Sequence, residues 1–402
     1  MAATAPPGDP APVDGLLPSE ALKQLGQRQF GVYIHVPYCA HRCGYCDFNT
    51  YVDTTGAAAS YVDAAVAELH LARRVLGDRA PVASTVFVGG GTPTLLPATE
   101  LVRLLEAVRE TFGLDDDAEV TSEANPESVD AAYLAQLRDG GYTRLSFGMQ
   151  SARSHVLATL ERRHTPGRPE QCVEWAREAG FDSVSLDLIY GTPGESDDDW
   201  AASVRTAVGA RPDHVSAYGL TVEAGTRLHA QVSRGELAAP DDDVLADRYE
   251  IADDLLTAAG YGWYEISNWA RENTARCRHN LGYWTDADWW GIGPGAHSHV
   301  GGVRWWNVRL PAEHAAALQA GHSPAQAREV LGAESRRVER ILLGVRLAEG
   351  HPVSDLNRTG RDAAQRFAAD GLVEAGPLAE GRVQLSRRGR LLADLVVQGI
   401  TG

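Results

Sequence analysis

The chain has 402 residues, 44% of them hydrophobic, and carries 54 acidic against 37 basic side chains, giving a formal net charge of −17. This length and composition can bury a large core, so the chain is not disordered throughout and suits one large domain with a smaller one. The acidic balance argues against a nucleic-acid partner, whose phosphates require clustered Lys and Arg. No apolar run approaches the roughly 20 residues of a membrane span, and the Pro-rich, acidic start does not resemble a signal peptide. We therefore expect a globular, cytoplasmic protein with no integral membrane segment.

Residues 1–28 mix Ala, Pro, Gly and Asp without periodicity, which predicts a disordered tail. From residue 29 to about residue 225, β-branched runs alternate with stretches of helical period, the pattern of parallel βα units. Six strands are expected, and they begin at Gly31, Ser84, Ala118, Thr143, Ser183 and His214. The predicted fold class is α/β, a partial (β/α)6 TIM-like barrel, with its chemistry at the C-terminal ends of the strands.

Two further regions follow the barrel core. Residues 226–310 contain an acidic helical pattern and then seven of the nine tryptophans, between Trp263 and Trp306, and are expected to extend the barrel. Residues 311–402 combine short helical patterns with the segments GLVEAG, GRVQLS and RRGRLLADLVVQ, an order typical of a winged-helix-like domain. Since this domain lacks a strongly basic surface, we expect it to face a protein or cover a substrate.

Three of the five cysteines, Cys39, Cys43 and Cys46, form a Cx3Cx2C motif directly after the first predicted strand. Soft thiolates at this spacing select zinc or an iron–sulfur cluster. Zinc would need a fourth ligand, for which His41, Asp47 or a distant cysteine is available. A four-iron cluster held by three cysteines would leave one iron open for a ligand. The spacing alone leaves both interpretations open.

The motif and its position resemble the radical S-adenosylmethionine (radical SAM) superfamily. That resemblance implies a [4Fe–4S] cluster at Cys39, Cys43 and Cys46 and S-adenosyl-L-methionine bound at the open iron. The glycine-rich GGGTPTLL after the second strand resembles the turn that contacts the methionine part of the cofactor, where the lack of Cβ atoms allows close approach. A reduced flavodoxin or a ferredoxin-type protein is the implied electron donor.

Within the superfamily the chain resembles the oxygen-independent coproporphyrinogen III oxidase-like family over nearly its whole length, through YIHVPYC, GGGTPT, SEANPES, RLSFGMQS and DLIYGTPGES. The resemblance implies roles at successive strand ends. Arg162 would pair with the methionine carboxylate, which suits the fixed fork of a guanidinium, and Glu123 would hold the ribose hydroxyls. The other implied cofactor-binding residues are Tyr33, Tyr45, Gly90, Gly91, Thr92, Gln150, Asp187 and Thr221.

Two features divide this family. The decarboxylating oxidases carry a further cysteine two residues beyond the triplet, where this chain has Phe48. The segment RCRHNLGYWTDADWW contains an HNxxYW motif that resembles the haem-chaperone branch of the family. A neutral imidazole is a good ligand for haem iron, so His279 is the implied haem ligand, ahead of Cys277, His297 and His299.

The sequence therefore favours a haem chaperone that passes haem to an acceptor protein. Residue types allow two roles for the cofactor, which is either cleaved productively or used to sense redox state and gate transfer. The alternative functions are oxidative decarboxylation of coproporphyrinogen III, which Phe48 argues against, and a non-catalytic zinc protein.

Overall fold

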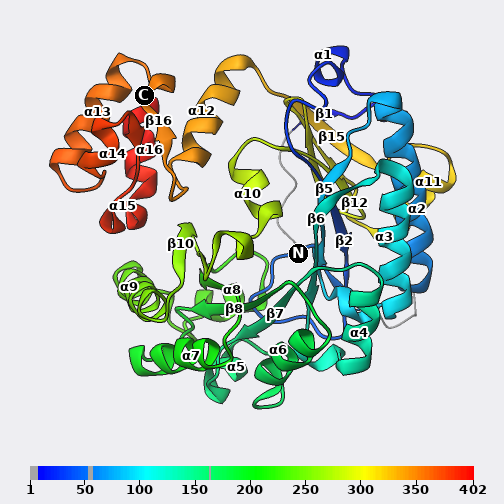
Figure 1. Cartoon of the computed structure of the whole chain (residues 1–402). Coiled ribbons are helices and arrows are strands. Elements are labelled where there is room, and N and C mark those ends of the chain that lie inside the picture. Colours follow the sequence, from blue (N-terminus) through cyan, green and yellow to red (C-terminus); the bar gives the residue numbers. More distant parts are fainter. Residues whose placement is uncertain (1–7, 53–57, 163) are drawn as a thin grey trace.

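The computed structural model describes residues 8–52, 58–162 and 164–402, and within these ranges its main feature is one 13-stranded sheet (Figure 1). In order across the sheet the strands are β1 (Asp9–Pro10), β15 (Ala325–Val330), β14 (Val303–Asn307), β13 (His297–Val300), β12 (Asp288–Ile292), β2 (Phe30–Val36), β5 (Ala83–Gly90), β6 (Leu114–Ala124), β7 (Arg144–Gln150), β8 (Ser183–Tyr190), β9 (His214–Gly219), β11 (Asn268–Ala270) and β10 (Gly262–Glu265).

The six predicted strands correspond to β2, β5, β6, β7, β8 and β9, which pair in this order and run parallel. Their apolar runs fill the core, as in β2, where Val32, Ile34 and Val36 are fully buried. The connecting helices are α2 (Ala58–Leu76), α3 (Ala98–Phe112), α4 (Ala131–Asp139), α5 (Ser154–Thr159), α6 (Arg168–Glu178) and α7 (Asp197–Gly209). The predicted partial (β/α)6 barrel is confirmed.

Strands of the Trp-rich segment, together with β15, extend the sheet at both edges of this barrel. β12 pairs parallel with β2, while β13, β14 and β15 continue antiparallel, and β11 and β10 extend the sheet beyond β9. Trp269, Trp290 and Trp305 are buried, and the rings of Trp290 and Trp305 meet edge to face at 4.7 Å between centroids. These tryptophans are therefore core residues of the extended sheet.

The expected disordered tail over residues 1–28 is wrong for residues 8–28. β1 pairs with β15, and α1 (Ser19–Leu22) buries Ala21 against Gly301. Leu17, Leu22 and Leu25 pack on the main core, so the apolar side chains dispersed among Pro and Gly anchor this segment. Residues 1–7 of the predicted tail lie outside the described residues.

The C-terminal region has a core of its own, but this core begins later than the expected boundary at residue 311. α11 (Pro311–Gln319) packs on α2 and β15 belongs to the main sheet, whereas the separate core extends from Ile341 to Ile400. The segments GLVEAG and GRVQLS meet in an antiparallel bridge between Val373 and Leu385. The elements here are α12 (Ala333–Gly344), β16 (His351–Pro352), α13 (Arg358–Ala369), α14 (Ala375–Ala379), β17 (Arg382–Val383), α15 (Arg387–Leu391) and α16 (Ala393–Thr401).

The remaining elements are short connections and the helices next to the barrel. They are β3 (Tyr38–Cys39), β4 (Tyr51–Val52), α8 (Arg227–Ser233), α9 (Asp242–Ala258), α10 (Arg278–Trp284) and the 3-10 helices Gly77–Arg79, Pro93–Leu95, Pro126–Ser128, Asn273–Ala275 and Val353–Asp355. α10 contacts both β5 and α12, so it lies between the barrel and the C-terminal region, as Figure 1 shows.

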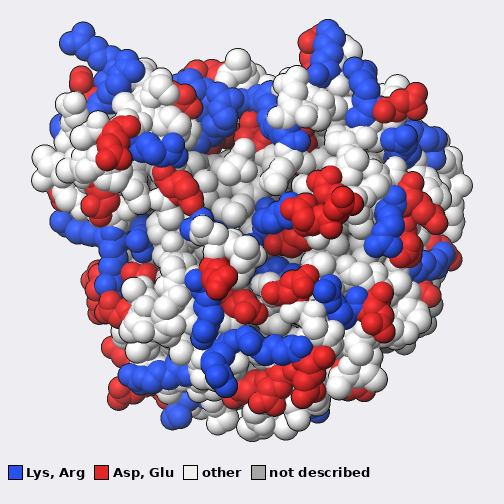
Figure 2. Space-filling model, viewed as in Figure 1, with Lys and Arg blue, Asp and Glu red and all other residues white. Residues whose placement is uncertain are grey.

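Charges of both signs are interspersed over the face shown in Figure 2, with no broad surface of a single sign. In the described parts of the chain, no helix has both the length and the apolar character needed to cross a membrane.

One buried carboxylate joins α2 to the strands added by the Trp-rich segment. The side chain of Glu68 is 1% exposed and accepts hydrogen bonds from the Gly293 amide at 2.7 Å and from Asn307 Nδ2 at 2.6 Å. His314 Nε2, on α11, lies 2.7 Å from the same carboxylate. Glu68 therefore fixes α2, α11 and the turn after β12 to one another.

We expect Glu68→Ala to lower the free energy of unfolding by about 3–5 kcal/mol, because it leaves buried polar partners unpaired. Urea unfolding followed by circular dichroism measures this change. Glu106→Ala on α3 is the matched control, since Glu106 forms a half-exposed ion pair with Arg109 and should cost no more than ~1 kcal/mol. Equal losses in the two variants would contradict the structural role of Glu68.

Candidate functional site

The three cysteines of the Cx3Cx2C motif line a single cavity at the C-terminal ends of the barrel strands. β2 ends at Val36, and Cys39, Cys43 and Cys46 follow on the loop that includes β3. The cavity has a volume of about 770 Å³ and also receives the ends of β5, β6, β7, β8 and β9. The structure therefore brings the cysteines to the barrel rim where the sequence predicts chemistry.

The glycine turn after β5 supports the cysteine loop through its backbone. The Gly91 amide donates to Val36 O at 2.7 Å and the Thr92 amide donates to Tyr38 O at 2.8 Å. A Cβ atom at Gly91 would lie 2.5 Å from Tyr38 O, so only glycine permits this approach. Since these amides are already used, the turn offers a ligand its carbonyl oxygens, which suit an ammonium group.

Two donors lie against the cysteine sulfurs. Thr92 Oγ1 donates to Cys39 Sγ at 3.8 Å, and Arg162 Nη1 donates to Cys43 Sγ at 3.8 Å. Burial raises the pKa of the Cys39 thiol and raises the pKa of Cys46 to about 11. A thiolate that is removed from water is unfavourable in free energy, so the cationic Arg162 next to Cys43 Sγ stabilises the cysteine loop.

The donor set fits an iron–sulfur cluster better than zinc. Across the described ranges, no three His, Cys, Asp or Glu side chains converge on one point where a single ion would bind. Zinc needs its ligands within about 2.3 Å of one point, whereas each cysteine of a four-iron cluster binds a different iron. Three cysteines along one wall of a roomy cavity match the second arrangement.

Most of the residues implied to bind the cofactor line the same cavity. They are Tyr45, Gly90, Gly91, Thr92, Glu123, Gln150, Arg162, Asp187 and Thr221. Gln150 has a positive φ of 64° at a register shift between β7 and β8, which ends the regular strand at the rim. Arg162 is held by a hydrogen bond from Nη2 to Gly148 O at 3.1 Å, so its guanidinium lies between the cysteine loop and the end of β7.

Two carboxylates stand deeper in the cavity wall. Glu123 accepts a hydrogen bond from the Gly90 amide at 2.9 Å, and Asp187 accepts one from Ser146 Oγ at 2.8 Å. Burial, reinforced by the charge of Asp187, raises the pKa of Glu123 to about 7, and burial also raises the pKa of Asp187. Both carboxyl groups therefore take up a proton at a higher pH than an exposed acid does.

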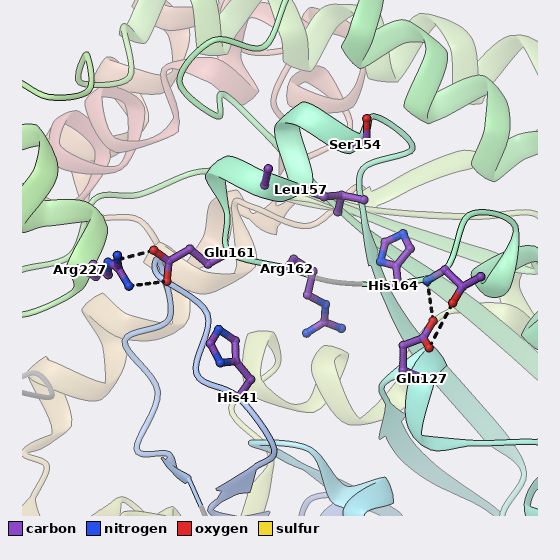
Figure 3. A pocket seen from close by; sticks show the side chains of 10 residues that line it. His41, Glu127, Ser154, Leu157, Glu161, Arg162, His164 and Arg227 are labelled. Atoms are coloured by element: carbon purple, nitrogen blue, oxygen red, sulfur yellow. Dashed lines mark hydrogen bonds and ion pairs between the residues drawn. The ribbon is translucent and has the colours of Figure 1, made fainter.

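The outer mouth of the cavity opens beside the cysteine loop (Figure 3). His41 and Arg162 point toward the same space, which has a volume of about 710 Å³. An ion pair between Arg227 and Glu161, at 2.9 Å, borders one side of it. Since His41, Glu161 and Arg162 also line the cysteine cavity, the mouth is a polar entrance to that cavity.

An inner chamber of about 300 Å³ adjoins the cysteine cavity inside the barrel. Its lining residues are Tyr33, Phe87, Glu123, Arg144, Ser146, Asp187, His214, Ser216, Tyr218, His279, Asn280 and Tyr283. Tyr33, expected against the cofactor, lies here instead, where its hydroxyl bonds to His35 Nδ1 at 2.9 Å.

His279 also faces this chamber, from α10. Its ring is buried, with Nδ1 2.9 Å from Thr85 Oγ1 and Nε2 2.8 Å from Tyr283 OH. Burial lowers the pKa of His279 to about 3, which keeps the imidazole neutral. The other haem-ligand candidates differ in place, since Cys277 and His299 are buried and His297 is exposed beside Trp306.

Sequence reasoning missed several residues of the two cavities. Ser146, Gly148 and Ile189 line the cysteine cavity, and Arg144 and His214 line the chamber. The alternation along β7, in which Arg144, Ser146, Gly148 and Gln150 share one face, is the signal that could have identified the residues on this strand.

Comparisons with known proteins agree with this geometry. Residues 33–207 match the Radical SAM superfamily. A haem chaperone, HemW, of Mycobacterium tuberculosis is 51% identical over 396 residues, which are 98% of this chain and 98% of the relative. HemW of Bacillus subtilis is 33% identical over 377 residues, covering 92% of this chain and 98% of the relative.

The solved structure of coproporphyrinogen III oxidase (HemN) from Escherichia coli is similar with a TM-score of 0.82, over 97% of this chain and 94% of that one. At 23% identity this likeness shows the fold alone. The full-length similarity to the haem chaperones is what decides the family, and the chain therefore belongs to the HemW family of the radical SAM superfamily.

Proposed function

We propose that this chain binds haem and passes it to an acceptor protein while it holds a [4Fe–4S] cluster and exchangeable S-adenosyl-L-methionine. The observation that carries the proposal is the adjacency of two sites. The cysteine loop and the strand-end residues line one cavity, and the HNxxYW segment closes the chamber that adjoins it. The names of the full-length relatives support the haem part of the proposal.

Cys39, Cys43 and Cys46 would hold the cluster, which supplies one-electron reduction when bound. Arg162, whose Nη1 lies 3.8 Å from Cys43 Sγ, would offset the charge of the thiolates, and its side chain lines the cavity. A reduced flavodoxin or ferredoxin-type protein is the proposed electron donor.

The strand-end residues would bind S-adenosyl-L-methionine through complementary groups. The carbonyl oxygens of Gly90 and Gly91 suit an ammonium group, and Arg162 suits a carboxylate. Glu123 and Asp187 suit ribose hydroxyls, because each carboxylate keeps oxygen lone pairs facing the cavity. Tyr45, Thr92, Gln150 and Thr221 complete the walls.

His279 would ligate haem iron through Nε2. The imidazole is neutral, as a ligand must be, but Nε2 currently shares a hydrogen bond with Tyr283 OH at 2.8 Å. Haem iron would therefore bind Nε2 only after the hydrogen bond between Nε2 and Tyr283 OH is broken.

We expect Cys39→Ala to abolish the cluster, because two remaining cysteines cannot hold it. Anaerobic reconstitution followed by iron and acid-labile sulfide analysis should give about four irons per chain for the wild type and almost none for the variant. Cys172→Ala is the matched control, since Cys172 is buried on α6, away from the cavity. Full iron content in Cys39→Ala would refute the assignment.

For haem, His279→Ala should weaken binding about tenfold or more in a titration of the Soret band, since an iron ligand is lost. Tyr283→Phe is the matched control, because it removes the competing hydroxyl and keeps the ring. It should bind haem at least as tightly as the wild type. If both variants behave like the wild type, His279 is not the ligand.

The alternative function, oxidative decarboxylation of coproporphyrinogen III, has one structural point in its favour, the fold shared with HemN. Against it, Phe48 stands at the cavity where the oxidases carry a cysteine, and its side chain is exposed. We expect no vinyl-bearing product when reconstituted protein is incubated with coproporphyrinogen III, reductant and S-adenosyl-L-methionine. Accumulation of that product, followed by chromatography, would establish the alternative.

A further inference from the structure

A cleft lined by arginines lies between α10 and the C-terminal region. It has a volume of about 500 Å³ and shares no described lining residue with the inner chamber or the cysteine cavity. On the barrel side it is lined by Arg276, Arg278, Leu281 and Trp284, and on the other side by Arg340 of α12, Leu347, Glu349 and Arg382 of β17. This arginine cleft is therefore a separate site beside the helix that carries the HNxxYW motif.

The arginine cleft concentrates positive charge in an acidic chain. Its described lining residues include four arginines and one acid, whereas the whole chain has a formal net charge of −17. The side chains of Arg276 and Arg278 are 24% and 31% exposed, and Arg340 and Arg382 are exposed. All four guanidinium groups are therefore accessible, and an anion is the ligand that they favour.

Arg340 has the most free donors of the four. Within the described residues its side chain forms no ion pair and no hydrogen bond. Arg278 pairs with the exposed Asp117, with 3.3 Å between Nη1 and Oδ2, and a pair of this kind contributes little free energy. Both arginines can therefore turn their donors to a ligand at small cost.

The other two arginines are held in place by Glu349 and its neighbour. Arg276 forms an ion pair with the Glu349 carboxylate, which joins the barrel side of the cleft to the C-terminal side. Arg382 donates from Nε to Glu349 O and from Nη2 to Gly350 O, each at 2.6 Å. Since these contacts order the guanidinium of Arg382 and leave its Nη1 free, part of the site is formed before a ligand arrives.

The imidazole of His351 responds to the charge of the cleft. Burial lowers the pKa of His351, and the charges of Arg340 and Arg382 lower it further, although Asp355 acts in the opposite direction. Arg340 of α12 and Arg382 of β17 therefore lie close enough to act on the same group.

Apolar side chains form the rest of the wall. Leu281 and Trp284 are half-buried on α10, and Leu347 lines the C-terminal side. Leu347 is fixed by an antiparallel bridge to Glu265 at the end of β10. A cleft that combines an aromatic and aliphatic wall with arginine donors suits a ligand with a flat apolar body and carboxylate groups.

We propose that the arginine cleft binds a porphyrin by its propionate carboxylates, with Arg340 and Arg382 as the main donors and Trp284 against the tetrapyrrole. This inference deepens the proposed function and rests on it, because haem is the porphyrin that the chain is proposed to carry. His279 faces the inner chamber and not the cleft. Binding in the cleft therefore uses the carboxylates and is independent of the iron.

The experiment uses protoporphyrin IX without iron, whose binding to the cluster-reconstituted protein is followed by fluorescence anisotropy. Arg340→Glu should bind it about tenfold more weakly than the wild type, because a charged hydrogen-bond donor is replaced by a repelling charge. Arg361→Glu is the matched control, since Arg361 is exposed on α13 and is not one of the lining residues. Its affinity should equal that of the wild type.

Protoporphyrin IX dimethyl ester tests the role of the carboxylates. Esterification should weaken binding to the wild type by a similar factor, and the ester should bind the wild type and Arg340→Glu equally. Binding of the free acid to the wild type should also weaken as the salt concentration rises, because salt screens the arginine charges.

A Soret titration with haem tests the proposed function separately. Loss of protoporphyrin binding in Arg340→Glu supports the inference even when haem shows no iron ligation, so the two failures are distinguishable. Thermal unfolding shows whether Arg340→Glu is folded, and Arg340→Gln is the second variant, which removes the donors without adding a negative charge. If neither variant folds, the comparison of free acid with ester on the wild type decides.

Two results would overturn the inference. The first is that the wild type does not bind protoporphyrin IX. The second is that the free acid and the ester bind the wild type equally, with no loss in the folded Arg340 variants. Any haem bound by the protein would then lie outside the arginine cleft.

Discussion

The backbone contact between the glycine turn after β5 and the cysteine loop after β2 is the constraint on which the site depends. Gly91 lies so close to Tyr38 that a single Cβ atom would separate the two segments. The contact continues the parallel pairing of β2 with β5 beyond the last residues of both strands. Because this contact fixes the loop to the end of β5, the cysteines lie over the barrel. There Arg162, which is also bonded to Gly148 on β7, lies 3.8 Å from Cys43 Sγ. Without this contact, the cysteine loop would lose the hydrogen bond between Thr92 and Cys39 and the position of Cys43 beside Arg162.

Much of this arrangement follows from the sequence because it rests on local rules. Runs of β-branched residues at the period of a strand predict the six parallel strands, and parallel strands bring their C-terminal ends to one rim. Glu123 and Gln150, each at or near a strand end, were therefore expected to meet, and they line one cavity. Tyr33 and Asp187 show the limit of this reasoning. Each stands three residues before the end of its strand, yet Asp187 lines the cysteine cavity and Tyr33 lines the inner chamber.

Other features depend on contacts between distant segments, which residue types do not reveal. The tryptophans between 263 and 306 suggest an aromatic pocket, but Trp290 and Trp305 pack on each other inside an extended sheet. Residues 8–28 resemble a tail, yet β1 gains its partner from β15, more than 300 residues away. Arg144 is the first residue of β7, where an arginine is usually exposed to solvent, yet its side chain is buried inside the barrel.

The inner chamber and the cysteine cavity share part of their walls. α10 is fixed by Glu119, whose carboxylate accepts the amides of Arg278 and His279, while Glu119 also acts on the charge of Arg144. At the other end of the chamber, Glu123 and Asp187 belong to the walls of both spaces. A charge that enters either cavity therefore changes the proton affinity of carboxylates that face the other. Such shared acids couple two ligands through electrostatics alone, without any movement of the sheet, and the coupling is necessarily reciprocal. Under the proposed function, a ligand in the chamber and a ligand in the cysteine cavity therefore act on the same two acids, Glu123 and Asp187.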